Sequence, residues 1–204
     1  MTDANSARRD IGWAFAWAGC RLSSLFALVF YGADAWAAQR AGRWQIYADW
    51  ELAIPYWPAA YPLYHSVFLL PVLLACKVRS ASQLRHWERA MATAIVLAGA
   101  GFVLLPAELG FAPADPGAWS PVAQFTGLVA GRYNLLPSLH VALSLLTLRW
   151  LWPLAGSRLR LALGWWWLML VASVLLTHQH HLADVLSGAA LGAWLGRGAA
   201  RPHR

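Results

Sequence analysis

Long apolar stretches separated by short polar connections dominate the chain. Stretches of about 20 residues let a helix cross the hydrocarbon core of a bilayer, and helices satisfy their own backbone hydrogen bonds there. The pattern therefore predicts an all-α fold, a polytopic transmembrane helix bundle with about six spans. Arg21 and Asp34 interrupt the first stretch, so an interfacial helix followed by a short span is an alternative there. The predicted spans are approximately residues 11–38, 55–76, 90–106, 137–154, 159–176 and 180–196.

The composition supports a membrane protein. Hydrophobic residues make up 59% of the chain and charged residues only 12%, with a mean hydropathy of +0.45, far more apolar than a soluble domain. The formal charge of +7 resides in short clusters between apolar runs, without the basic, aromatic-lined face of a nucleic-acid-binding protein. We expect a single integral-membrane domain over residues 1–204, with the lipid bilayer and no nucleic acid as partner.

The charges of the connections are asymmetric. By the positive-inside rule, the chain is expected in the plasma (inner) membrane with both termini cytoplasmic. The starts of the fourth and sixth spans, which carry His140 and His180, would then share the extracytoplasmic side. The expected cytoplasmic cations are Arg8, Arg9, Lys77, Arg79, Arg85, Arg89, Arg149, Arg158, Arg160, Arg197, Arg201 and Arg204; the expected outer charges are Arg40, Arg43, Arg132, Asp49, Glu51, Glu108 and Asp115.

The first polar cluster is Pro137-Ser138-Leu139-His140. Proline suits the first position of a helix, so we expect the amides of Ser138, Leu139 and His140 to be free at a helix N-terminus. Such a terminus binds phosphate readily. The alternative is an ordinary N-cap with a solvated interfacial histidine.

The second cluster is His180 and Asp184, which begin a stripe at i,i+4 spacing that continues through Gly188, Gly192 and Gly196. Glycines at this spacing favour close approach of a neighbouring helix, so the pair should point into the bundle. A carboxylate at i+4 can orient one imidazole nitrogen and leave the other free to attack phosphorus. The alternative is a buried pair that only locks helix packing. His181 is expected to face the lipid headgroups.

These motifs resemble a known family. Pro-Ser-x-His at 137–140, followed about forty residues later by His-x-x-x-Asp at 180–184, resembles the type 2 phosphatidic acid phosphatase superfamily. Leu139 and Thr177-x-x-His180 are more similar to its inositol phosphorylceramide synthase-like branch and bacterial relatives. Asp49-Trp50-Glu51 is similar to a segment before the second helix of those relatives.

The resemblance implies roles for four residues. His180 would form a phosphohistidine, Asp184 would orient it, His140 would protonate the leaving oxygen, and Ser138 would bind the substrate phosphate. The implied enzyme is a lipid phosphatase acting on a phospholipid or polyprenyl phosphate without a cofactor. Head-group phosphotransfer, as in inositol phosphorylceramide or sphingomyelin synthases, is the alternative.

Two cationic motifs of the superfamily are missing. No lysine and Arg-Pro pair precedes Pro137, and the position of a Ser-Arg pair reads Ser173-Val174. Charge stabilisation carries much of phosphoryl transfer, so other groups must supply it. Arg132 is the first candidate, His178 the second and Arg43 the third.

Two interpretations of other classes compete. Histidine clusters bind zinc or iron. A histidine-rich iron site in a membrane protein would need several groups of histidines, but His86 falls on the cytoplasmic side and His65 stands alone. We therefore expect no metal site. A non-catalytic transporter or scaffold could use a structural His-Asp pair; the Pro-Ser-x-His helix start favours the enzyme. The residues that would form the metal site are His140, His178, His180, His181 and Asp184.

Overall fold

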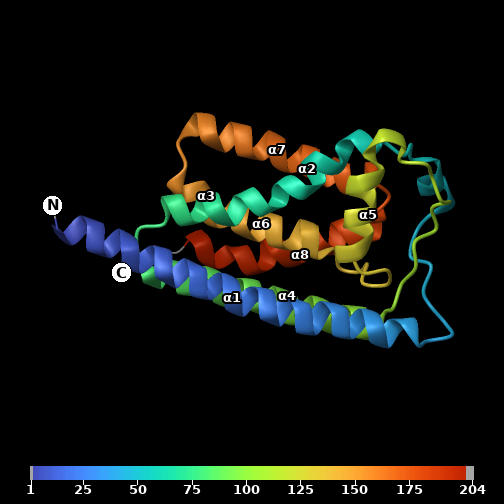
Figure 1. Ribbon diagram of the computed structural model, residues 1–204, viewed down its shortest axis with the longest axis horizontal. Helices are drawn as coiled ribbons and strands as arrows, with labels where there is room; N and C mark the ends of the chain where they lie inside the picture. The colour runs from blue at the N-terminus through green and yellow to red at the C-terminus, as the bar shows by residue number, and fades with distance from the viewer. Residues whose placement is uncertain (1, 201–204) are drawn as a thin grey trace.

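The protein is all-helical, as Figure 1 shows, and the computed structural model describes residues 2–200. Within that range no strand forms; only Trp44 and Ala107 make an isolated β-bridge. The α-helices are α1 (Thr2–Ala38), α2 (Tyr61–His65), α3 (Leu69–Lys77), α4 (Ala81–Leu104), α5 (Ser120–Val129), α6 (Leu139–Leu151), α7 (Ser157–Leu176) and α8 (Leu182–Leu195); the 3-10 turns are η1 (Asp49–Ala53), η2 (Pro58–Ala60), η3 (Ser66–Phe68), η4 (Gly117–Trp119), η5 (Trp152–Leu154) and η6 (Gly196–Ala200).

The helical membrane fold is confirmed, whereas the count of six spans is not. Among the described residues, four helices are long and apolar enough to cross a membrane. The other two predicted spans correspond to shorter helices: the apolar segment Leu139–Leu154 and the 14-residue α8. Helix α6 begins after its N-cap Ser138, and α8 begins after its N-cap His181. The four long helices are Arg9–Ala38, Pro58–Lys77, Ala81–Leu104 and Ser157–Leu176.

The first span is one continuous helix, so the alternative of an interfacial helix and a short span is wrong. Both polar residues that interrupt its apolar pattern have partners. The Arg21 guanidinium donates two hydrogen bonds to the Glu88 carboxylate of α4, at 2.6 and 2.9 Å. Asp34 accepts a hydrogen bond of 2.8 Å from the backbone N–H of Tyr133. The first contact joins α1 to α4, which lie side by side in Figure 1, and the second joins α1 to the connection between α5 and α6.

The glycine stripe faces a neighbouring helix, as predicted. A Cβ on Gly188 would overlap the carbonyl oxygen of Ser138, and a Cβ on Gly192 would overlap that of Ala142. Only glycine, which has no Cβ, therefore permits this distance between α8 and α6. The crossing of these two helices depends on glycine at both positions.

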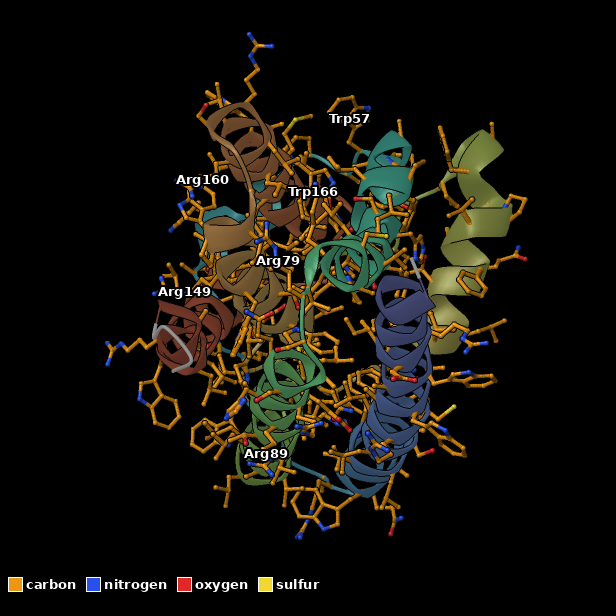
Figure 2. The ribbon with its side chains drawn as sticks, turned by 90° about the vertical axis from the view of Figure 1, so that its left-hand side faces the viewer. Trp57, Arg79, Arg89, Arg149, Arg160 and Trp166 are labelled. Atoms are coloured by element: carbon orange, nitrogen blue, oxygen red, sulfur yellow. The ribbon has the colours of Figure 1, made fainter. Side chains whose placement is uncertain are left out.

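The two ends of the bundle differ in charge. Figure 2 views the end that carries both ends of the described chain, where Arg79, Arg89, Arg149 and Arg160 gather. The connections on the opposite end, residues 39–60 and 105–119, carry four of the nine acidic residues, Asp49, Glu51, Glu108 and Asp115. Four of the cations predicted to share one side of the membrane thus lie at one end of the bundle. Arg201 and Arg204 lie outside the described residues.

The short helix α5 was not predicted. It has ten residues, too few to span a bilayer, and it lies between two of the predicted spans. Thr126 is buried in it and shares a hydrogen bond of 2.9 Å with Nε2 of His65. This contact fixes α5 against the helix that leads into α3.

Replacing Gly192 by alanine tests the crossing. The new Cβ would overlap the backbone of α6, and overpacking of this kind costs about 1–3 kcal/mol. Gly19→Ala in α1 is the matched control, because no atom lies within 4 Å of its added Cβ. Both variants gain helix propensity, so only Gly192→Ala should lower the melting temperature in detergent. Equal melting temperatures would contradict the packing described here.

Candidate active site

Ser138 joins the start of α6 to α8. It is fully buried and caps α6, with its hydroxyl oxygen accepting a hydrogen bond of 3.4 Å from the N–H of Val141. Its own N–H donates to the backbone carbonyl of Asp184 at 2.9 Å. The two polar clusters, separated by about forty residues in sequence, therefore meet at one point.

The sequence predicted Pro137 at the first position of the helix, and this prediction is wrong. Pro137 precedes the N-cap, joined to Leu136 by a cis peptide bond, and Ser138 takes the cap because a serine oxygen satisfies a first-turn amide. The amide of Ser138 is also not free. Leu139 and His140 are the first two helical residues, whose N–H groups have no acceptor within the helix.

His140 lies against Tyr64 of α2. Its Nε2 is 2.8 Å from the Tyr64 carbonyl oxygen, and the two rings stack with centroids 4.0 Å apart. A carbonyl only accepts hydrogen bonds, so Nε2 carries a hydrogen and Nδ1 is the nitrogen available for proton exchange. The alternative of a solvated interfacial histidine is not what the structure shows.

A tight turn between α7 and α8 places His180. His178 adopts a left-handed conformation with φ of 55°, and the amides of Gln179 and His180 both donate to the carbonyl of Val174, at 3.0 and 3.2 Å. The chain thus reverses at the end of α7, and His180 arrives just before α8.

His180 and Asp184 form a buried pair. Nδ1 of His180 is 3.4 Å from Oδ2 of Asp184, and the side chains are nearly inaccessible to solvent. The same Oδ2 accepts a hydrogen bond of 2.9 Å from the N–H of His181. The carboxylate therefore faces Nδ1, and Nε2 is the nitrogen of His180 that remains for other chemistry.

His181 is buried, so the prediction that it faces the headgroups is wrong. It is 1% exposed, lies between the rings of Tyr47 and Phe111, and accepts a hydrogen bond of 3.2 Å from the Gly110 N–H at Nε2. Burial lowers the pKa of His181, which lies in the turn before α8. The error arose because His181 precedes the helix and does not follow its periodicity.

The three candidate cations have different surroundings. Arg132 is exposed, with its guanidinium carbon 5.7 Å from the centre of the Tyr133 ring, and Arg43 lies 4.0 Å from the same ring. His178 is engaged with the protein, because its Nε2 donates a hydrogen bond of 2.9 Å to the Ile54 carbonyl. Both arginines thus lie beside the segment that leads into α6.

Within residues 2–200, no three histidine, cysteine, aspartate or glutamate side chains are grouped so that they could hold one metal ion. The histidines of the two clusters have separate partners. His180 faces Asp184, His181 faces Glu51, and His140 contacts a backbone carbonyl.

This arrangement can be compared with known proteins. Residues 48–195 match the model of the PAP2 superfamily. The chain belongs to this superfamily. Comparisons with curated proteins and with solved structures gave no match. Membership supports an activity of the phosphatase or phosphotransferase type and suggests a phosphorylated lipid as substrate; the matched residues include both polar clusters.

The sequence did not predict two residues that contact the polar clusters, Tyr64 and Glu51. Tyr64 supplies both the carbonyl and the ring that hold His140, but nothing distinguishes it in an apolar stretch. Glu51 is 4% exposed and bonds the first amide of α8. The similarity of Asp49-Trp50-Glu51 to a segment of family relatives was the signal that could have identified Glu51.

Replacing Ser138 by alanine should separate helix capping from activity. Ser80→Ala is the matched control, because the Ser80 hydroxyl caps α4 by accepting from the Gln83 N–H at 3.2 Å. Losing a cap costs about 1 kcal/mol, so thermal unfolding should show similar losses of stability in both variants. Only Ser138→Ala should lower phosphate release, by roughly tenfold, which matches one lost hydrogen bond of about 1.4 kcal/mol. Equal activity of the two variants would contradict a role for Ser138 at the site.

Proposed function

We propose that this PAP2 protein is a membrane-embedded lipid phosphatase that cleaves a lipid phosphate or pyrophosphate through a phosphohistidine, without a metal ion. The observation that carries the proposal is the Ser138 to Asp184 backbone hydrogen bond. It holds the start of α6, with its free first-turn amides, beside the His180-Asp184 pair. A non-catalytic scaffold would need the pair but not the adjoining helix start.

In the proposed first step, Nε2 of His180 attacks phosphorus. The bond from phosphorus to the lipid oxygen breaks, and His140, protonated while the negatively charged phosphate is bound beside it, donates its Nδ1 proton to the leaving oxygen. Asp184 stabilises the positive charge that develops on the His180 ring, as a buried carboxylate does in other triads.

In the second step, a water molecule attacks the phosphohistidine. His140, now neutral, takes a proton from the water at Nδ1, the bond between phosphorus and Nε2 of His180 breaks, and inorganic phosphate leaves. The Tyr64 carbonyl keeps Nε2 of His140 protonated throughout, so a single nitrogen serves as acid and then as base.

For the phosphate oxygens we propose the first-turn amides of α6, the Ser138 hydroxyl and Arg132. The amides lie at the positive end of the helix dipole, which favours an anion. The exposed guanidinium of Arg132 lies a few residues before Ser138 and is the nearest arginine in sequence. His178 was a further candidate; its hydrogen bond to Ile54 supports the different role inferred below.

Phosphate release from a panel of lipid phosphates, measured with EDTA on detergent-purified protein, tests the mechanism. His180→Ala should lower the rate by at least about 10³-fold, and acid-labile, base-stable phosphate should label the wild type but not the variant. His86→Ala is the control, because His86 lies near the start of α4, a helix that begins at the end of the bundle opposite the start of α6 (Figure 1).

Other outcomes of this assay have definite meanings. Release that disappears with EDTA would replace the histidine mechanism by a metal-dependent one. Wild-type protein that releases no phosphate, but transfers a head group to an added lipid alcohol, would identify a phosphotransferase. Failure of both reactions would favour a non-catalytic membrane protein.

We further propose that the protein resides in the plasma (inner) membrane, with both termini cytoplasmic and the site on the outer side. In a chain with Cys20 and Cys76 replaced by serine, a membrane-impermeant maleimide should label Ala114→Cys in intact cells. Ser157→Cys, which is also exposed but at the other end, should react only after lysis. The reverse pattern would invert the proposed topology.

A further inference from the structure

Five rings form a continuous column beside the site. Their order is Tyr47, His181, Phe111, His178 and Tyr56. The centroids are 4.4 Å apart between Tyr47 and His181, then 4.3 Å and 3.9 Å on the two faces of Phe111. Tyr56 closes the column at 5.2 Å from His178, tilted by 49°.

The column joins three segments that are distant in sequence. Tyr47 and Tyr56 flank η1 in the connection from α1 to α2, Phe111 belongs to the connection from α4 to α5, and the two histidines belong to the turn before α8. The first two connections run side by side (Figure 1) and exchange backbone hydrogen bonds, among them Trp44 N–H to the Pro106 carbonyl at 2.8 Å.

Hydrogen bonds fix the orientation of both histidine rings. Nε2 of His178 donates to the Ile54 carbonyl at 2.9 Å, whereas Nε2 of His181 accepts from the Gly110 N–H at 3.2 Å. His181 therefore carries its hydrogen on Nδ1, which lies 3.4 Å from Oε2 of Glu51. Neither ring can rotate without losing a bond.

Glu51 extends the same attachment to α8. Its Oε1 accepts from the Ala48 N–H at 2.9 Å, and its Oε2 accepts from the N–H of Leu182, the first residue of α8, at 2.7 Å. A carboxylate at this position also complements the positive end of the helix. A buried charge is stable only when it is bonded in this way, so Glu51 ties the outer connection firmly to α8.

The attachments lie on both sides of His180. His178 precedes it by two residues, His181 follows it directly, and the N–H of His181 also bonds the Asp184 carboxylate. The backbone of His180 is thus held from both directions, while its own Nδ1 faces Asp184.

We propose that the ring column, together with Glu51, positions His180 for attack, and that His178 and His181 are positioning residues which do not bind the substrate phosphate. This inference rests on the proposed function of His180. Displacement of a reacting group by about 1 Å can cost about 10²-fold in rate, so a loosened turn should lower kcat while substrate binding persists.

Phe111 is the best position for a test, because its ring contacts both histidines. Phe111→Leu should lower kcat by roughly 10²-fold with KM changed less than about threefold. Phe111→Tyr keeps an aromatic ring and should retain most of the wild-type rate. Phe125→Leu is the control, since Phe125 is 53% exposed on α5 and lies outside the column. A rise in KM alone, or equal effects of both leucine variants, would overturn the proposal.

His178→Asn separates positioning from phosphate binding. Asparagine tolerates the left-handed backbone at this residue, so the turn should form. Positioning predicts a lower kcat with unchanged inhibition by inorganic phosphate. A phosphate ligand would instead show weaker inhibition and a higher KM, which would overturn the assignment.

Hydrogen–deuterium exchange provides a readout that does not require activity. Amides of residues 177–183 should exchange faster in Phe111→Leu than in wild type or Phe125→Leu. Unchanged exchange would overturn the proposal that the ring column holds this turn, even if the enzyme is active. If the wild type shows no turnover but Phe111→Leu still exchanges faster, the proposed function is overturned, whereas the proposal that the column holds the turn is supported.

Discussion

The close crossing of α6 and α8 is the constraint on which the rest of the structure depends. Two glycines, Gly188 and Gly192, bring the helix backbones so near that a single added carbon would overlap a carbonyl of α6. At this separation the Ser138 N–H reaches the Asp184 carbonyl, so packing and site geometry have the same origin. Small residues allow such proximity in a lipid environment, where no hydrophobic effect drives helices together.

The polar groups gathered at this crossing are costly to bury, and the surrounding segments compensate for them. Asp184 accepts from a backbone amide, His140 donates to a carbonyl, and Glu51 accepts from two amides. All of these partners belong to the backbone. Backbone groups are held by the fold, so they orient the side chains without conformational freedom of their own.

The connections from α1 to α2 and from α4 to α5 also hold the turn before α8. Backbone hydrogen bonds join residues 39–60 to residues 105–119. Stacked rings join both segments to the turn before α8. Gly110 packs so tightly against Tyr47 that a Cβ there would overlap the ring. The ring contacts join both connections to the turn that carries His180.

The sequence by itself determined the helical membrane fold, the superfamily, the pairing of His180 with Asp184 and the direction of the glycine stripe, because hydropathy and i,i+4 spacing are local properties of a helix. Only the tertiary structure decided that α6 begins after Ser138 as its N-cap and not with Pro137 as its first residue, that α1 is unbroken, and that His181 is buried. Those outcomes depend on partners distant in sequence: the Asp184 carbonyl, Glu88 and Phe111. No local pattern encodes a contact whose other half lies in another segment.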